Sequence, residues 1–142
     1  MIKSPAKKKV VKEFLTTYQR LLRTINMETD KVAKLRSLTE KVTQHLSFTR
    51  GGKNEGFVKQ VDEIVEFENR ISERLTELER VRNEIENAIS KIGNPLQEEI
   101  LQRKYIIGES IEEIADKQGY SVQYIRNEHA KALQAIDKII NA

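Results

Sequence analysis

The chain has 142 residues, a formal net charge of +3 and no cysteine. The absence of cysteine excludes a disulfide framework and a thiolate zinc site. No apolar stretch approaches the roughly 18 residues that a membrane span requires, so we expect a cytoplasmic protein without a membrane partner. Hydrophobic residues make up 38% and charged residues 33%, with two prolines and six glycines, a composition that favours long helices over a sandwich or barrel.

A heptad pattern of apolar residues marks the first segment. Steps of alternately three and four residues from Val11 to Leu46 meet apolar residues at nine of eleven positions, and no proline interrupts them. A seam of this length predicts a helix at about residues 8–46. The seam consists of Val11, Phe14, Tyr18, Leu21, Ile25, Glu28, Val32, Leu35, Thr39, Val42 and Leu46.

The pattern stops in residues 47–56, where two adjacent glycines with polar neighbours indicate a flexible loop. It resumes in a second predicted helix at about residues 57–92. Nine of the eleven seam positions are again apolar, and the seam consists of Phe57, Val61, Ile64, Glu68, Ile71, Leu75, Leu78, Arg82, Ile85, Ile89 and Ile92.

Two arrangements are open for this arm of residues 1–92. The two helices can fold back on each other as a long antiparallel hairpin resembling a coiled coil, or each seam can pair with a second copy in a homodimer. Residues 1–54 carry a net charge of +9 and residues 55–91 a net charge of −4, and this opposition favours the hairpin. Because a helix pair buries only one stripe on each helix, a dimer built on the hairpin is also compatible.

The remaining residues, 94–142, are predicted to form a separate three-helix domain. Gly93 and Asn94 end the second helix, and Pro95 suits the first position of a short third helix. Gly108 ends that helix. Its candidate core residues are Leu96, Ile100, Leu101, Tyr105 and Ile106.

The segment Ser110–Ile136 predicts a helix-turn-helix. Ser110 and Glu113 have the spacing of a capping box, which starts a helix by satisfying its free N–H groups. Ala115 is small where a second helix must pass closely, and Gly119 follows where a tight turn requires a positive φ. Ser121 then caps a second helix that begins at Val122. Its expected inward residues are Ile125, Ala132, Leu133 and Ile136.

Such a second helix presents its N-terminal residues to the major groove of double-stranded DNA. Gln and Asn can pair bidentately with adenine and Arg with guanine, while Val can contact a thymine methyl group. We therefore expect four outward residues to read bases, and three further residues complete the candidate set. The base readers are Val122, Gln123, Arg126 and Asn127, and the further DNA contacts are Ser121, Tyr124 and Lys131.

The same segment resembles a known family. Glu112-Glu113, Ile125-Arg126 and the A-K-A-L of residues 130–133 align it without gaps to the last region of housekeeping sigma factors. The chain is still more similar to small phage and prophage proteins related to the ArpU-type late transcriptional regulators. That second resemblance includes Phe14, Leu15, Tyr18, Leu101, Tyr105, Ile106, the G-Y-S of residues 119–121 and the H-A-K-A-L of residues 129–133.

The resemblance implies a sequence-specific transcription regulator in a bacterial host cell, with RNA polymerase as a further partner of the arm. It places the four base readers where sigma factors touch the promoter. Three positions depart from the family: sigma factors have Arg where Val122 stands, Glu where Gln123 stands and an apolar residue where Glu128 stands. The resemblance therefore does not imply the usual promoter sequence. We expect Glu128 at a solvated edge of the helix or bonded outward.

Two other functions fit the sequence. A small terminase subunit of a phage also couples a helix-turn-helix to a helical hairpin, but in the reverse order and as a ring. A coiled-coil protein could instead use the C-terminal motif for docking. An enzyme is not expected, because His45 and His129 stand apart and no Gly-rich phosphate loop, metal site or cofactor site is present. We expect His129 to be partly buried and hydrogen-bonded. Lys7, Lys8 and Lys9 are candidates for phosphate contacts or for a solvated tail.

Overall fold

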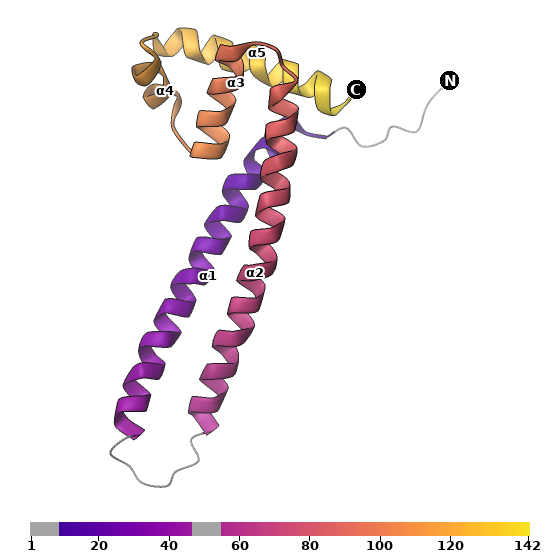
Figure 1. Ribbon diagram of the computed structural model, residues 1–142. Helices are drawn as coiled ribbons and strands as arrows, with labels where there is room; N and C mark the ends of the chain where they lie inside the picture. Colours follow the sequence, from indigo (N-terminus) through magenta and orange to yellow (C-terminus); the bar gives the residue numbers. More distant parts are fainter. Residues whose placement is uncertain (1–8, 47–54) are drawn as a thin grey trace. The chain divides into compact units, whose positions relative to one another are not determined.

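The computed structural model describes residues 9–46 and 55–142. These residues are helical apart from short connections and form no strand, so the predicted all-α class is confirmed. The predicted loop lies mostly outside the described residues, as do Lys7 and Lys8. The helices, labelled in Figure 1 except for the π-helix η1, are α1 (Val11–Leu46), α2 (Glu55–Ser90), α3 (Pro95–Leu101), η1 (Gln102–Ile107), α4 (Ile111–Gln118) and α5 (Val122–Ile140).

The chain divides into two compact units. One comprises Met1–Arg20 with Glu79–Ala142, and the other is Leu21–Leu78. The sequence suggested a division at residues 92–94. In the structure the start of α1 and the end of α2 instead group with the C-terminal helices, because these turns carry fully buried side chains such as Leu15, Ile85 and Ile89.

In the unit Leu21–Leu78, α1 and α2 lie side by side and run antiparallel (Figure 1). Two ion pairs give the register. Glu28 pairs with Arg74 at 3.1 Å between Oε1 and Nε, and Arg36 pairs with Glu68. As residue numbers rise along α1, those of the partners fall along α2. Val32 is buried between the two ion pairs, and Ile25 and Ile64 are buried beyond them along the same helix pair.

The seam predicted for α1 is confirmed from Val11 to Thr39, while the side chains of Val42 and Leu46 lie outside those described; the seam predicted for α2 needs a correction. On α1, all nine seam positions from Val11 to Thr39 are buried or half-buried. On α2, alternate predicted positions are exposed, and the residue before each is buried or half-buried instead. The exposed positions are Val61, Glu68, Leu75 and Arg82, and the inward ones are Gln60, Phe67, Arg74 and Val81. The pattern was ambiguous because α2 carries apolar residues on two adjacent stripes.

In the other unit, α3, α4 and α5 share a small core. Ile100, Ile114, Ala115 and Ile125 are buried together, and Ala132 and Ile136 are buried further along α5. Burial of each large aliphatic side chain contributes about 1.5–3 kcal/mol. Ile100, Ile125, Ala132 and Ile136 are thus buried as expected from the sequence, with Leu133 half-buried beside them.

The third helix changes its winding before it ends. After Leu101 it continues as the π-helix η1, which the sequence did not predict. Gly108 ends it with φ +95°, as expected for the stop. The side-chain amide of Gln19 on α1 donates to the carbonyl oxygens of Tyr105 and Ile106 at 3.3 and 2.8 Å. A side chain distant in sequence thus satisfies carbonyls at the end of this turn.

Within the described residues, none of the helices is both long and apolar enough to cross a lipid bilayer.

Candidate functional site

The turn between α4 and α5 has the local geometry that the sequence predicted. The Glu113 N–H donates to Ser110 Oγ at 3.1 Å, and the Ser110 N–H donates back to Glu113 Oε1 at 3.3 Å, so the capping box is confirmed. Gly119 ends α4 with φ +72°, a left-handed conformation that favours glycine. The Tyr124 N–H donates to Ser121 Oγ at 3.1 Å, which confirms Ser121 as the cap of α5.

Close packing beneath this turn holds the two helices together. Ala115 is buried, and a larger side chain there would occupy space that α5 uses. Val122 is half-buried and packs on the cluster that contains Ile114 and Ile125. The expected outward position of Val122 is therefore wrong: this first residue of α5 is half-buried because its side chain packs on the core of the turn.

The other predicted contact residues form one exposed surface. Ser121, Gln123, Tyr124, Arg126, Asn127 and Lys131 are all exposed. We call this set the α5 surface. Gln123 donates from its amide to Asn127 Oδ1 at 3.1 Å. Lys131 lies 3.3 Å from Glu128 Oε1. The structure thus brings the two amide residues together, one turn apart, directly after the turn.

Arg126 has an acidic neighbour that the sequence analysis used only as a family match. Its Nη2 lies 3.4 Å from Glu112 Oε1 on α4. Both side chains are exposed, so the pair is weak and open to exchange with another anion. Glu113 and Asp116 are also exposed on α4. An anionic ligand on the α5 surface would therefore meet one arginine beside several acids.

Tyr120 is a second residue that the sequence analysis missed. It lies in the turn, and its ring centroid is 4.9 Å from that of Tyr124. Both rings are exposed. The spacing of four residues across a helix cap was the signal that could have found this pair. Two phenol groups at one edge of the α5 surface offer donors and flat apolar area to a partner.

A cluster of charges fixes the connection into α4. The buried carboxylate of Glu109 accepts from Arg103 Nη1 at 2.9 Å and lies 3.3 Å from Lys117 Nζ. Arg103 also donates to Glu99 at 3.1 Å. Burial acts to raise the pKa of Glu109, but the hydrogen bonds from Lys117 and Arg103 outweigh it and hold that pKa below its usual value. The start of α4 is thereby tied to both α3 and η1.

Glu128 is placed differently from the expectation. It is buried, not at a solvated edge, and its carboxylate accepts from the Gln97 amide at 3.2 Å and pairs with Lys131. The Gln97 hydrogen bond is the largest cause that lowers the pKa of Glu128, and Lys131 lowers it further. A carboxylate is accommodated at this buried position because α3 supplies a hydrogen-bond donor, Gln97.

His129 is half-buried and hydrogen-bonded, as expected. Its partner is the hydroxyl of Tyr105 at 2.8 Å. Lys9, the described member of the basic tail, does not lie near the α5 surface. Its N–H donates to Asn141 Oδ1 at 2.8 Å beyond the last residue of α5, about 28 Å along that helix from Val122 at 1.5 Å per residue. Its ammonium pairs with Glu84.

Among the described residues, no group of three or more His, Cys, Asp or Glu side chains could hold a metal ion. Comparison of the chain with protein-family models, with curated proteins and with solved structures finds no match in any of the three.

Proposed function

We propose that the chain is a sequence-specific DNA-binding transcription regulator that reads the major groove with the first two turns of α5. The observation that carries this proposal is the polar α5 surface standing directly after a tight, capped turn. Gln123, Arg126 and Asn127 are exposed there, and the inward side of the same helix packs against α4 through a shared buried cluster. A rigid helix end with amide and guanidinium groups is what base recognition requires.

The proposed architecture is a long helical hairpin arm followed by a helix-turn-helix domain. The resemblance of Gly108–Ile136 to the last region of sigma factors supports this assignment, and so does the similarity to phage late regulators. In this proposal Arg126 pairs with guanine, and Gln123 and Asn127 contact adenine. Ser121, Tyr124 and Lys131 contact the sugar-phosphate backbone, and Val122 holds the turn.

The charges near the site shape how such a protein binds. Residues 92–142 carry a net charge of −2, and Glu112 already pairs with Arg126. Since phosphate contacts dominate affinity for DNA, one copy of this domain is expected to bind weakly. The arm then contributes by joining two readers, by adding basic residues or by contacting RNA polymerase.

The test is a selection of bound sequences from random duplex DNA by the full chain at about 50 mM salt, where phosphate contacts are strong. Recovery of one short motif, bound more tightly than shuffled duplex, supports the proposal. Binding without any enriched motif contradicts base reading. No binding to duplex at low salt contradicts the proposal as a whole and favours the docking function.

A further inference from the structure

On one side of the helix pair in the unit Leu21–Leu78, several apolar residues are exposed. Val58, Val61 and Val65 follow α2 at spacings of three and four and so share one side of the helix. Leu75 lies on the same side, 14 residues after Val61. All four are exposed. A groove lined by both helices adjoins them. We call Val58, Val61, Val65, Leu75 and this groove the valine face.

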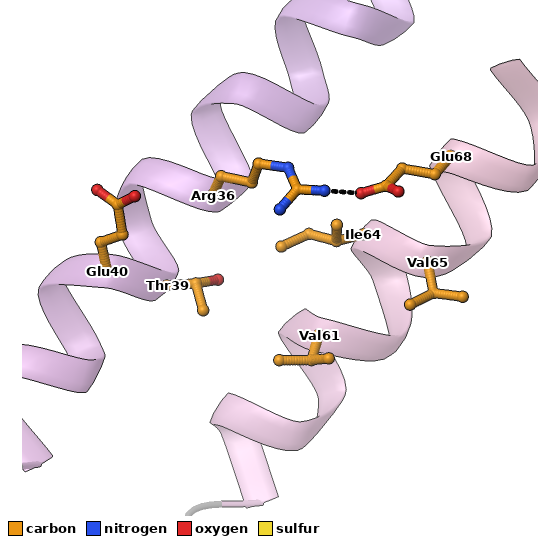
Figure 2. Close-up of a pocket in the computed structure, with 7 residues that line it drawn as sticks. All are labelled: Arg36, Thr39, Glu40, Val61, Ile64, Val65 and Glu68. Atoms are coloured by element: carbon orange, nitrogen blue, oxygen red, sulfur yellow. Dashed lines mark hydrogen bonds and ion pairs between the residues drawn. The ribbon is translucent and has the colours of Figure 1, made fainter.

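Figure 2 shows the groove of the valine face. Side chains of α1 and α2 line its two walls, and the Arg36–Glu68 ion pair crosses one end. Val61 and Ile64 lie on the α2 wall, and Thr39 stands on the α1 wall. The lining is mixed: Val61, Ile64 and Val65 offer methyl groups, and Arg36, Glu40 and Glu68 are charged.

The other side of the same helix pair is built differently. Its groove is lined by Lys31, Lys34, Leu35, Glu63 and Phe67, and we call these residues the lysine face. The guanidinium of Arg70 lies 4.9 Å from the centroid of the Phe67 ring. A charged side chain thus covers the aromatic residue on the lysine face, whereas the valines opposite have exposed methyl groups.

Valine is an unfavourable choice for a solvated helix surface. Its branched side chain loses rotamer freedom in a helix and gains nothing from water. Three valines on one side are instead typical of a position that packs against another helix. The seam between α1 and α2 uses one stripe of α2, and the valine face is a second stripe.

The charges of α1 and α2 indicate which partner packs on the valine face. In residues 21–41, α1 carries five basic and three acidic residues, whereas residues 56–78 of α2 carry three basic and six acidic ones. Lys31, Lys34 and Glu63 line the lysine face, so this opposition belongs to the two helices as wholes and not to pairs across the valine face. A second copy placed with its α2 on α1 sets a net positive helix beside a net negative one, whereas α2 on α2 sets two net negative helices together. An isologous two-fold axis parallel to the helices produces both favourable contacts at once.

We propose that the valine face is a self-association surface on which a second copy of the chain packs, with α1 of each copy against α2 of the other. The result is a four-helix bundle in which both apolar stripes of α2 are buried. This assembly is independent of whether the chain binds DNA.

The chain offers a matched pair of variants for the test. Val61 is 37% exposed and Val65 52%, while Leu38 is 37% exposed and Met27 54% on the side of α1 that carries Lys31 and Lys34. V61K/V65K and M27K/L38K therefore add the same charge at equally exposed apolar positions on opposite faces. Circular dichroism of each variant checks that helix content is unchanged.

Sedimentation velocity of the full chain gives the mass in solution. We expect the wild type and M27K/L38K to sediment as dimers of the 16.5 kDa chain. V61K/V65K should become monomeric, with Kd raised at least about tenfold, since two buried unpaired charges oppose association. A monomeric wild type, a closed ring, a dimeric V61K/V65K variant, or equal dissociation of both variants would overturn the proposal.

Salt dependence tests the arrangement of the two copies. If opposite charges meet across the interface, the dimer Kd of the wild type should rise between 50 and 500 mM NaCl, because screening weakens attraction. A Kd that falls, or does not change, would overturn the pairing of α1 with α2 of the other copy.

Discussion

The hydroxyl oxygen of Tyr105 lies 2.8 Å from Nε2 of His129, and the two rings stack with centroids 5.8 Å apart. This contact joins the π-helix η1 to α5 beneath the α5 surface. Burial raises the pKa of Tyr105 to about 12. Burial also lowers the pKa of His129, and the nearby charge of Lys104 lowers it further. Both groups are therefore neutral near pH 7.

Acid should weaken the fold through His129. The pKa of His129 is lower in the folded chain than the value of about 6.5 that a histidine has in an unfolded chain. As the pH falls, the unfolded chain therefore takes up the proton first, and protonation stabilises the unfolded state relative to the folded one. We expect the urea midpoint of the full chain to drop from pH 7.5 to pH 5. His129→Gln should flatten this dependence. The lowered pKa values of Glu109 and Glu128 act only below this window. An equal slope in wild type and variant would contradict the prediction.

Arg126→Ala should weaken binding to a selected duplex by about 1–3 kcal/mol if the guanidinium pairs with guanine. It should also relax the choice of base at one position. The control is Lys138→Ala, which removes an equal charge in the last turn of the same helix. Fluorescence anisotropy with selected and shuffled duplex separates the two roles. Equal losses on both duplexes would make Arg126 a phosphate contact and refute base reading by this residue.

Glu112→Gln should strengthen DNA binding. The carboxylate of Glu112 holds Arg126 at 3.4 Å, and its charge repels phosphate, so neutralising it removes both effects. Asp116→Asn removes the same charge from α4 at another exposed position. We expect a gain of several-fold for Glu112→Gln in anisotropy at about 50 mM salt, where screening is weak. A gain of equal size in both variants would show that only net charge matters and that the ion pair has no part.

Local signals in the sequence were sufficient for the turn. The capping box, Gly119 and the Ser121 cap each depend on residues within four positions of one another, and all three are present. The heptad seam of α1 was equally clear because α1 carries one dominant apolar stripe. Contacts between distant segments were not predictable. One example is the hydrogen bond from Gln19 to the end of η1, and another is the hydrogen bond from Gln97 to Glu128. In both, the two residues are far apart in the sequence and no local pattern connects them.

The errors on α2 and at Val122 have physical causes as well. Val61 and Leu75 fit a heptad seam as well as the true inward residues do, and only the partner helix decides which stripe is buried. Val122 was predicted to face outward only from its position at the start of the second helix. Its partial burial depends on packing against a cluster that residues of α3, α4 and α5 form together. A single sequence carries neither piece of information.

Gly119→Ala should destabilise the full chain by about 1–2 kcal/mol, the cost of a left-handed conformation for an L-residue. No atom lies within 4 Å of an added Cβ, so the cost comes from the backbone and not from a clash. Gly119→Asn should cost less, because Asn tolerates this conformation. Gly119→Val should cost more than Ala, since β-branched residues tolerate it least. Urea unfolding gives the order, and equal stabilities for all four proteins would contradict a strained turn.

Replacing residues 21–78 by a short glycine linker should leave the other unit folded, because Met1–Arg20 and Glu79–Ala142 are one compact unit. It keeps Leu15, Gln19 and Ile85, which a fragment of residues 94–142 lacks, so we expect cooperative unfolding for the former and marginal stability for the latter. Residues 21–78 carry ten basic and ten acidic residues and so no net charge. Affinity of the shortened chain for selected duplex should still fall, with a shallower slope of log K against log salt, because a second reader held by self-association is lost. The full chain is measured beside it in the same buffers. Identical affinity and slope would show that the arm makes no contribution to DNA binding and would leave it as a surface for a protein partner.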